Sequence, residues 1–176
     1  MNLTKMTLKN NLGKASLLVV AIVAFCAFRD CQRENFSKEA LEQTLMDTTN
    51  SKIVFEDIVK KHKGKVTVIE VWASWCGDCV KAMPKIKTMQ QDFPKVDYVF
   101  VSMDKSYEKW IEGIKNHELK GEHYWATEGM KGSFGKAIDL DWIPRYIIMD
   151  SRGTVVTYRA IETDFEKMYD TLKTIQ

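Results

Sequence analysis

The sequence predicts one α/β domain with a mixed central β-sheet, preceded by a short N-terminal extension. Apolar, β-branched runs of strand length alternate with segments of helical periodicity. Near the C-terminus two strand-like runs form a hairpin, which adds antiparallel pairing to the sheet. The chain has 176 residues, 45% of them hydrophobic, which suffices for one domain with a substantial core.

The first 29 residues have the layout of a secretory signal peptide or signal anchor. Lys5, Lys9 and Lys14 precede the apolar run ASLLVVAIVAFCAF at positions 15–28. A membrane-spanning helix needs roughly 20 apolar residues and a signal peptide only about 7 to 15, so cleavage near Ala27 and a short retained anchor both stay open. Under the positive-inside rule we expect the rest of the chain on the extracytoplasmic, periplasmic side, secreted or tethered to the inner membrane.

Residues 30–50 are polar and are predicted as a linker that carries a lead-in helix. Within them, SKEALEQTLMD at positions 37–47 has its apolar residues near one face, and Ser37 can cap the start of this helix. The globular domain is therefore expected over residues 51–176.

The predicted domain is built around a strand that is followed at once by a helix. The run KVTVIEVWA at positions 65–73 is apolar nearly throughout, which is typical of a strand covered on both faces. From Cys76 to Asp92, apolar residues recur every three to four positions, so this stretch is predicted as a helix. A pair of cysteines thus opens a helix directly after a central strand.

The second half of the chain alternates in the same way. Its predicted elements are a buried strand at 97–104, a helix at 106–119, a short strand and a helix near 132–140 within the long segment 105–141, a hairpin of 145–150 with 154–160, and a C-terminal helix capped by Thr163 with Glu166.

Cys76 and Cys79 can be interpreted as metal ligands, as a structural disulfide or as a redox-active pair. Zinc needs four ligands, whereas His62, His117 and His123 are isolated from one another, so we predict no metal site. A disulfide that closes so small a ring restricts the unfolded chain very little. A redox pair does need this spacing, because a helix N-terminus stabilises the first thiolate and the second cysteine resolves a mixed disulfide. Cys76 is therefore predicted as the nucleophile and Cys79 as the more buried resolving cysteine.

Charge and composition exclude two other classes of partner. The formal net charge is +2, and the lysines are scattered among acidic residues, so we predict no nucleic-acid partner. The chain has no phosphate-binding glycine loop, and we predict no cofactor.

The stretch VWASWCGDC, at positions 71–79, resembles the active-site segment of the thioredoxin superfamily. The resemblance extends from about Ile53 to the C-terminus and implies a thioredoxin-like fold with a redox-active Cys76–Cys79 disulfide. Pro84 stands where such proteins carry a proline that kinks the active-site helix. The signal or anchor segment and the long segment before Pro144 resemble the extracytoplasmic TlpA/ResA-like branch.

The same resemblance assigns roles to four further residues. Pro144, in WIPRYIIMDSRGTVV, would be a cis-proline facing the cysteines, with the Ile143 backbone available to pair with an extended substrate. Trp75 resembles the family's exposed aromatic beside the nucleophile. Glu70 falls where many members bury an acid beneath the disulfide. Burial would raise the pKa of Glu70 and allow it to exchange a proton with Cys79, unless the side chain is simply solvated.

Gly77 and Asp78 stand between the cysteines, where the family commonly has a proline-containing pair. A negative charge at Asp78 opposes thiolate formation at Cys76, and the motif contains no basic residue. We therefore expect a reductant of disulfides in exported proteins or apocytochromes, recharged by a membrane electron donor of the thiol-disulfide type. Two alternatives stay open. They are a disulfide oxidase or isomerase, and a copper-delivery module in which His123 lies near the cysteine pair.

Overall fold

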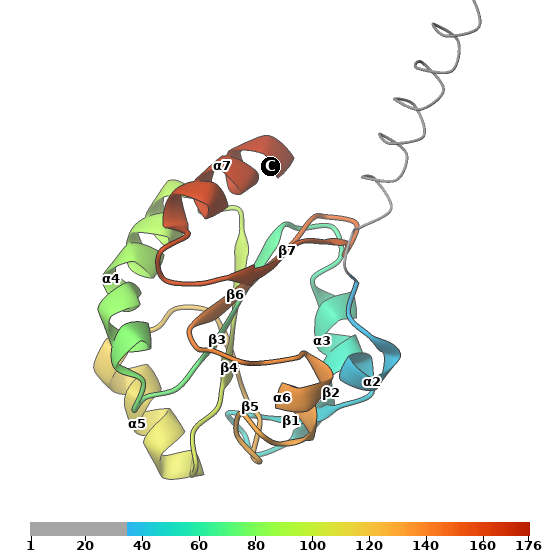
Figure 1. The fold of residues 1–176 in the computed structure, drawn as a ribbon, viewed down its shortest axis with the longest axis vertical. Coiled ribbons are helices and arrows are strands. Elements are labelled where there is room, and N and C mark those ends of the chain that lie inside the picture. Colours follow the sequence, from blue (N-terminus) through green and yellow to red (C-terminus); the bar gives the residue numbers. More distant parts are fainter. Residues whose placement is uncertain (1–34) are drawn as a thin grey trace, which may run out of the picture. The chain divides into compact units, whose positions relative to one another are not determined.

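The structure is a computed structural model and describes residues 35–176. In this part of the chain, seven strands form one sheet in the order β2-β1-β5-β4-β3-β6-β7 (Figure 1). Strands β3, β4 and β5 run parallel to one another, and the remaining neighbours pair antiparallel. The predicted mixed sheet is therefore confirmed.

The sheet carries helices on both faces. The strands are β1 (Thr44–Asp47), β2 (Lys52–Val54), β3 (Thr67–Trp72), β4 (Asp97–Ser102), β5 (Glu122–Trp125), β6 (Arg145–Met149) and β7 (Val155–Ala160). The helices are α2 (Lys38–Leu41), α3 (Phe55–Lys61), α4 (Gly77–Asp92), α5 (Tyr107–His117), α6 (Ser133–Ala137) and α7 (Phe165–Ile175). Figure 1 shows α4, α5 and α7 on one side of the sheet and α2, α3 and α6 on the other.

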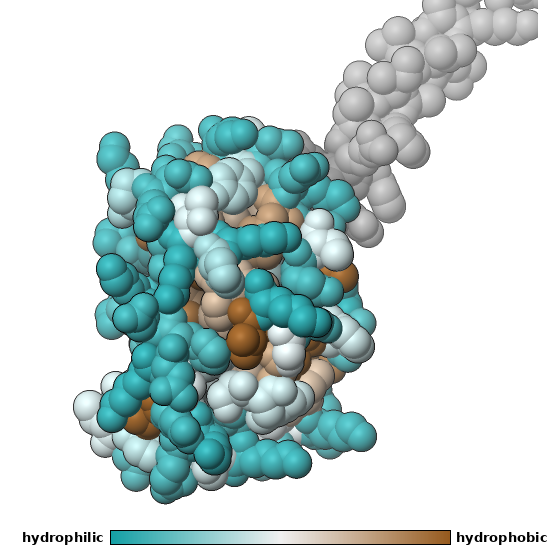
Figure 2. All heavy atoms as spheres, turned by 90° about the vertical axis from the view of Figure 1, so that its left-hand side faces the viewer, coloured by the Kyte–Doolittle hydropathy of each residue, from teal (hydrophilic) through white to brown (hydrophobic). Residues whose placement is uncertain are grey.

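The outer surface over α4, α5 and α7 is mostly hydrophilic (Figure 2). These helices are amphipathic, and each directs its apolar residues at the sheet, as Met168 and Leu172 of α7 do. Between the helix layers, β3 lies between β4 and β6, and each of its six residues is buried. The prediction of a strand covered on both faces is confirmed, and its C-terminal end leads directly to the cysteine pair.

The predicted lead-in helix over 37–47 is wrong in its second half. Ser37 does cap a helix, since its hydroxyl accepts a hydrogen bond from the Ala40 N–H, but α2 is only four residues long. Thr44–Asp47 then form strand β1, which pairs with β2 and β5 and buries Leu45. Long-range pairing overrides the local helical pattern here, and the folded unit includes residues that we assigned to a linker.

Helix α7 begins one residue later than its capping pattern predicts. Its N-cap is Asp164 and not Thr163. The Asp164 carboxylate accepts the backbone N–H of Ile161 at 3.1 Å and pairs with Lys167 at 2.8 Å. The predicted capping box is therefore not formed, because Asp164 takes the chain through a tight turn at residues 161–164.

The N-terminal signal or anchor, predicted over residues 1–29, lies outside the described residues. Within residues 35–176, no helix combines the length and the apolar character that a membrane crossing requires.

Candidate active site

Cys76 and Cys79 form a disulfide at the start of α4, with their Cα atoms 5.3 Å apart. Cys76 is the N-cap of this helix, and its sulfur accepts a hydrogen bond from the Cys79 backbone N–H at 3.1 Å. Cys79 is completely buried, whereas Cys76 retains 7% of its surface. The sulfur of Cys76 therefore lies at the positive end of a helix and is the more accessible of the two.

The loop before β6 lies against the same sulfur. The Ile143–Pro144 peptide bond is cis, as the resemblance implies. The carbonyl oxygen of Ile143 lies 3.5 Å from the Cys76 sulfur. Ile143 itself has no backbone hydrogen-bond partner among the described residues. Residues 67 positions apart thus meet at the disulfide, and the chain leaves a main-chain donor and acceptor beside it.

Glu70 is buried in β3, six residues before Cys76. Neither carboxyl oxygen has a hydrogen-bond partner at bonding distance within the described residues. Burial raises the pKa of Glu70 to about 8, and the hydroxyl of Tyr146 on β6 offsets only part of this shift. The expected buried acid is therefore present, and a solvated Glu70 is excluded. With such a pKa it can both take up and release a proton near neutral pH.

A buried acid that the sequence analysis did not identify holds the loop before Cys76. The Asp104 carboxylate accepts the Ser74 hydroxyl at 2.6 Å, the Ser74 backbone N–H at 3.1 Å and the Ser102 hydroxyl at 2.7 Å. The indole N–H of Trp125 donates to the Asp104 carbonyl at 2.8 Å. Asp104 directly follows the predicted strand run DYVFVSM, but no local pattern indicates a partner 30 residues away.

The residues next to the cysteines differ in their surroundings. Trp75 is 55% exposed, as expected for an aromatic beside the nucleophile. A Cβ at Gly77 would meet only open space, so this glycine is not required by packing. Asp78 lies in the first turn of α4, and its carboxylate is 3.4 Å from the Lys81 ammonium, an exposed pair that partly offsets its charge. Pro84 lies inside α4, as predicted.

The side chain of His123 makes packing contacts with its neighbours. Its ring stacks on Phe100 with centroids 5.1 Å apart, and its Nε2 lies 3.2 Å from the Leu119 carbonyl. His123 belongs to β5, which is separated from β3 by β4. No group of three Cys, His, Asp or Glu side chains among residues 35–176 could hold a metal ion.

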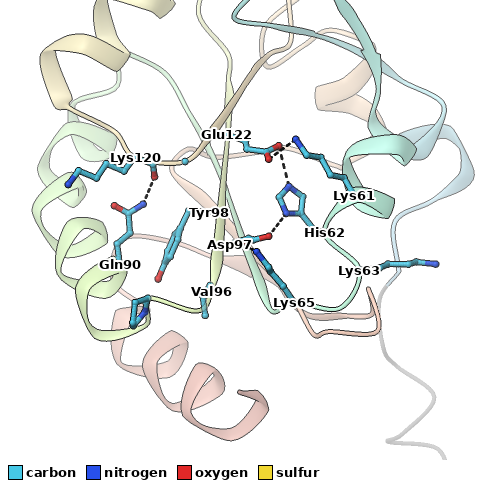
Figure 3. A pocket seen from close by; sticks show the side chains of 12 residues that line it. Lys61, His62, Lys63, Lys65, Gln90, Val96, Asp97, Tyr98, Lys120 and Glu122 are labelled. Atoms are coloured by element: carbon cyan, nitrogen blue, oxygen red, sulfur yellow. Dashed lines mark hydrogen bonds and ion pairs between the residues drawn. The ribbon is translucent and has the colours of Figure 1, made fainter.

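A pocket of about 560 Å³ opens near the start of β4 and β5 (Figure 3). The buried ring of His62 lies there between Asp97, at 2.8 Å, and Glu122, at 3.4 Å. Lys65 pairs with Asp97, and Lys61 pairs with Glu122. These ion pairs tie α3 to the two strands, and Lys63 and Lys120 also line the pocket without an ion pair among the described residues. The cysteine pair lies beyond the other end of β3, so this pocket is not part of the redox site.

Comparisons with known proteins agree with the thioredoxin-like fold. The family described as thioredoxin-like matches residues 64–155. Sporulation thiol-disulfide oxidoreductase A of Bacillus subtilis is 24% identical over 105 residues, which cover 57% of this chain and 62% of that protein. The solution structure of a candidate thiol-disulfide oxidoreductase from Bacteroides vulgatus superposes with a TM-score of 0.63 and 25% identity, covering 81% of this chain and 90% of that one.

A candidate thiol:disulfide interchange protein DsbE from Chlorobium tepidum has the same fold, with a TM-score of 0.64. It is 19% identical, and the match covers 77% of this chain and 94% of that one. The chain spans 33% to 62% of the length of the curated relatives it matches.

Proposed function

The chain belongs to the thioredoxin-like family, and we propose that it is a thiol-disulfide oxidoreductase that reduces protein disulfides through Cys76 and Cys79. One observation carries this proposal. The two cysteines form a disulfide at the N-terminus of α4, with the Cys76 sulfur beside the cis Ile143–Pro144 bond. A helix start favours the thiolate, and the adjoining loop offers backbone groups to a substrate.

In the proposed reaction the reduced protein supplies two electrons to a substrate disulfide. The Cys76 thiolate attacks one substrate sulfur, forms a mixed disulfide and releases the second substrate sulfur as a thiolate, which takes up a proton. Cys79 then loses its proton and attacks the Cys76 sulfur, which closes the Cys76–Cys79 disulfide and releases the first substrate sulfur. The products are a substrate dithiol and the oxidised protein. An external dithiol must then return two electrons to the pair.

We assign the proton transfer at Cys79 to Glu70. The carboxyl is buried on β3, directly before the cysteine segment, and its pKa of about 8 suits exchange with a thiol. An ionised Glu70 accepts the Cys79 proton when this cysteine attacks, and returns it when the pair is reduced again. Because Cys79 is completely buried, it needs such an internal base more than Cys76 does.

The proposed direction is reduction and rests on the charge at the start of α4. Asp78 disfavours the Cys76 thiolate, and a less stable thiolate makes the pair more reducing. Lys81 weakens this effect. The reduction potentials of thioredoxin and of the strong oxidant DsbA differ by about 150 mV, which corresponds to roughly 7 kcal/mol. An exposed charge contributes up to about 1 kcal/mol, so Asp78 supplies only part of a reducing potential. A disulfide oxidase or isomerase is the alternative.

We further propose that the protein acts outside the cytoplasm, on disulfides of exported proteins or apocytochromes. The lysine-flanked apolar run at residues 15–28 supports this location. Disulfides persist in that compartment, so a reductant there needs a membrane electron donor of the thiol-disulfide type.

Trapping tests the proposed reaction. In Cys79→Ser the mixed disulfide at Cys76 cannot be resolved, so this variant is expected to accumulate disulfide-linked substrates in the native compartment. Cys76→Ser, the matched control, should accumulate none. Absence of any trapped species from Cys79→Ser would contradict the proposal, because the second cysteine would then not be required.

A further inference from the structure

Three side chains of the protein interior carry oxygens without a hydrogen-bond partner. Among the described residues, the buried side-chain oxygens that lack one are both carboxyl oxygens of Glu70, the hydroxyl of Tyr146 and one carboxyl oxygen of Glu162. Buried oxygens are nearly always hydrogen-bonded, because an unpaired one is costly. Such groups need an explanation, and the reaction described so far uses only Glu70.

Glu70 and Tyr146 lie in one row across the sheet. Glu70 on β3 stands opposite Tyr146 on β6, and Tyr146 stands opposite Ala160 on β7. Side chains directly opposite each other lie on the same face of a sheet. The Tyr146 ring contacts Phe165 of α7, with the ring centroids 5.4 Å apart, so this is the face that α4 and α7 cover (Figure 1). The row therefore faces the helix that carries Cys79.

Glu162 continues this row towards the surface. It stands two residues after Ala160, in the turn that leads into α7, and it is half-buried. One of its carboxyl oxygens is buried, while the residue as a whole still reaches solvent. Burial raises the pKa of the Tyr146 hydroxyl, and the charges of Glu70 and Glu162 raise it further. The hydroxyl is therefore neutral and lies within electrostatic reach of both carboxyl groups.

Other charged groups near this row do not interrupt it. Arg145 precedes Tyr146 on β6, so its side chain points to the opposite face of the sheet, and it is paired with Asp141. Lys85 of α4 lies over the Phe165 ring, 5.2 Å from its centroid. Within the described residues, the charges that act on the Tyr146 hydroxyl are those of the two carboxyl groups.

The proton that Glu70 exchanges needs a route to solvent. Cys79 and Glu70 are both buried, so resolution of a mixed disulfide moves a proton from one interior group to another. Glu70 must lose this proton before the next cycle. A neutral tyrosine hydroxyl can accept one proton while it donates its own, because it is both an acceptor and a donor.

We propose that Tyr146 and Glu162 form a proton relay between Glu70 and solvent. In the outward direction, the Tyr146 oxygen takes the proton of the Glu70 carboxyl, and the hydroxyl passes its own proton to the Glu162 carboxylate. Glu70 is then ionised, Tyr146 is again neutral, and Glu162 releases the proton to water. The reverse sequence returns a proton when the disulfide is reduced. This inference rests on the proposed function, because both residues act through Glu70.

A pH jump on the oxidised protein tests the relay without any disulfide exchange. The infrared band of the protonated Glu70 carboxyl, identified by its loss in Glu70→Gln, reports how fast the proton leaves when the pH rises from about 6 to about 9. Tyr146→Phe and Glu162→Gln should each slow this loss at least about tenfold. The double variant should be no slower than the slower single variant, because both residues serve one path.

A matched control and the remaining outcomes make the test decisive. Tyr146→Phe keeps the ring and removes an unpaired hydroxyl, so it should fold. Glu166→Gln removes an exposed carboxylate from the first turn of α7 and should leave the rate unchanged.

A wild-type rate in either Tyr146→Phe or Glu162→Gln would overturn the relay. Effects that multiply in the double variant would also overturn it, since the two residues would then act independently. An equal slowing in Glu166→Gln would do the same, because surface charge in general would then set the rate. Absence of the protonated carboxyl band from the wild type would instead contradict the role of Glu70 in the proposed function.

Discussion

Glu70 and Tyr146 stand directly opposite each other on strands β3 and β6, and both side chains are buried. Each is adjacent to an element of the redox site, because β3 leads to Cys76 and β6 follows Pro144. The carboxyl lies in an apolar core without a hydrogen bond at bonding distance among the described residues, which raises its pKa to about 8. Strongly shifted pKa values are concentrated at functional sites, which agrees with the proton-transfer role that we propose for Glu70.

The stability of the oxidised protein should fall as pH rises. Below about pH 4.5 both the folded and the unfolded state carry the Glu70 proton. Between about pH 4.5 and 8 the unfolded state loses it and the folded state keeps it, so unfolding becomes easier by at most roughly 5 kcal/mol. Urea unfolding from pH 5 to 8 should show this loss in the wild type, and Glu70→Gln should lack it. If the free energy of unfolding changes with pH in the same way in the wild type and in Glu70→Gln, Glu70 is already ionised in the folded protein.

The rate at which Cys79 resolves a mixed disulfide should depend on the ionisation of Glu70. In the wild type we expect this rate to rise with pH through about 8, as the carboxylate forms. In Glu70→Gln resolution should be slower near pH 8, and its rise should move to higher pH, where Cys79 ionises without help. Stopped-flow mixing with a fluorescent peptide disulfide measures this rate. Unchanged kinetics would leave Glu70 with a structural role only.

Asp104 should stabilise the loop before Cys76. Asp104→Ala leaves the Ser74 N–H and hydroxyl and the Ser102 hydroxyl without their acceptor, so we expect a loss of roughly 2 to 3 kcal/mol in the free energy of unfolding. Asp104→Asn keeps one acceptor oxygen and should lose less. Asp170→Ala, an exposed acid on α7, should change stability by less than about 0.5 kcal/mol. An equally small effect at Asp104 would show that water replaces its carboxylate.

Removal of the charge at Asp78 should make the pair more oxidising. Asp78→Asn takes away a negative charge beside the Cys76 thiolate, which favours the reduced form. Lys81 already offsets part of this charge, so we expect the reduction potential to rise by at most about 20 mV. Equilibration with glutathione measures the shift, with Asp170→Asn as the control. A lower potential in Asp78→Asn would reverse the sign of the electrostatic argument.

The strand-and-helix unit that carries the cysteines was predictable because its patterns are local. An apolar run over 65–73 and a three-to-four repeat after Cys76 need no long-range information. The cis bond before Pro144 came from the resemblance, and the burial of Glu70 followed from its apolar neighbours.

Strand β1 and the Asp104 contacts were not predictable in the same way. Thr44–Asp47 continue a helical pattern and become a strand only because β2 and β5 lie beside them. In the sequence, Asp104 is recognisable only as a residue at the end of a strand. Its hydrogen bond with Ser74 forms only when the fold brings the two residues together.

The reduction potential of the Cys76–Cys79 pair tests the proposed direction of electron flow most directly. The purified protein would be equilibrated with glutathione or dithiothreitol buffers, quenched with acid and alkylated. The chain has two other cysteines, Cys26 and Cys31. Mass spectrometry of the peptide that contains Cys76 and Cys79 gives the oxidised fraction of this pair separately from them. A potential below about −230 mV is the expected result for a reductant that needs a membrane donor. A potential above about −180 mV would contradict the account and assign the protein to disulfide oxidation or isomerisation.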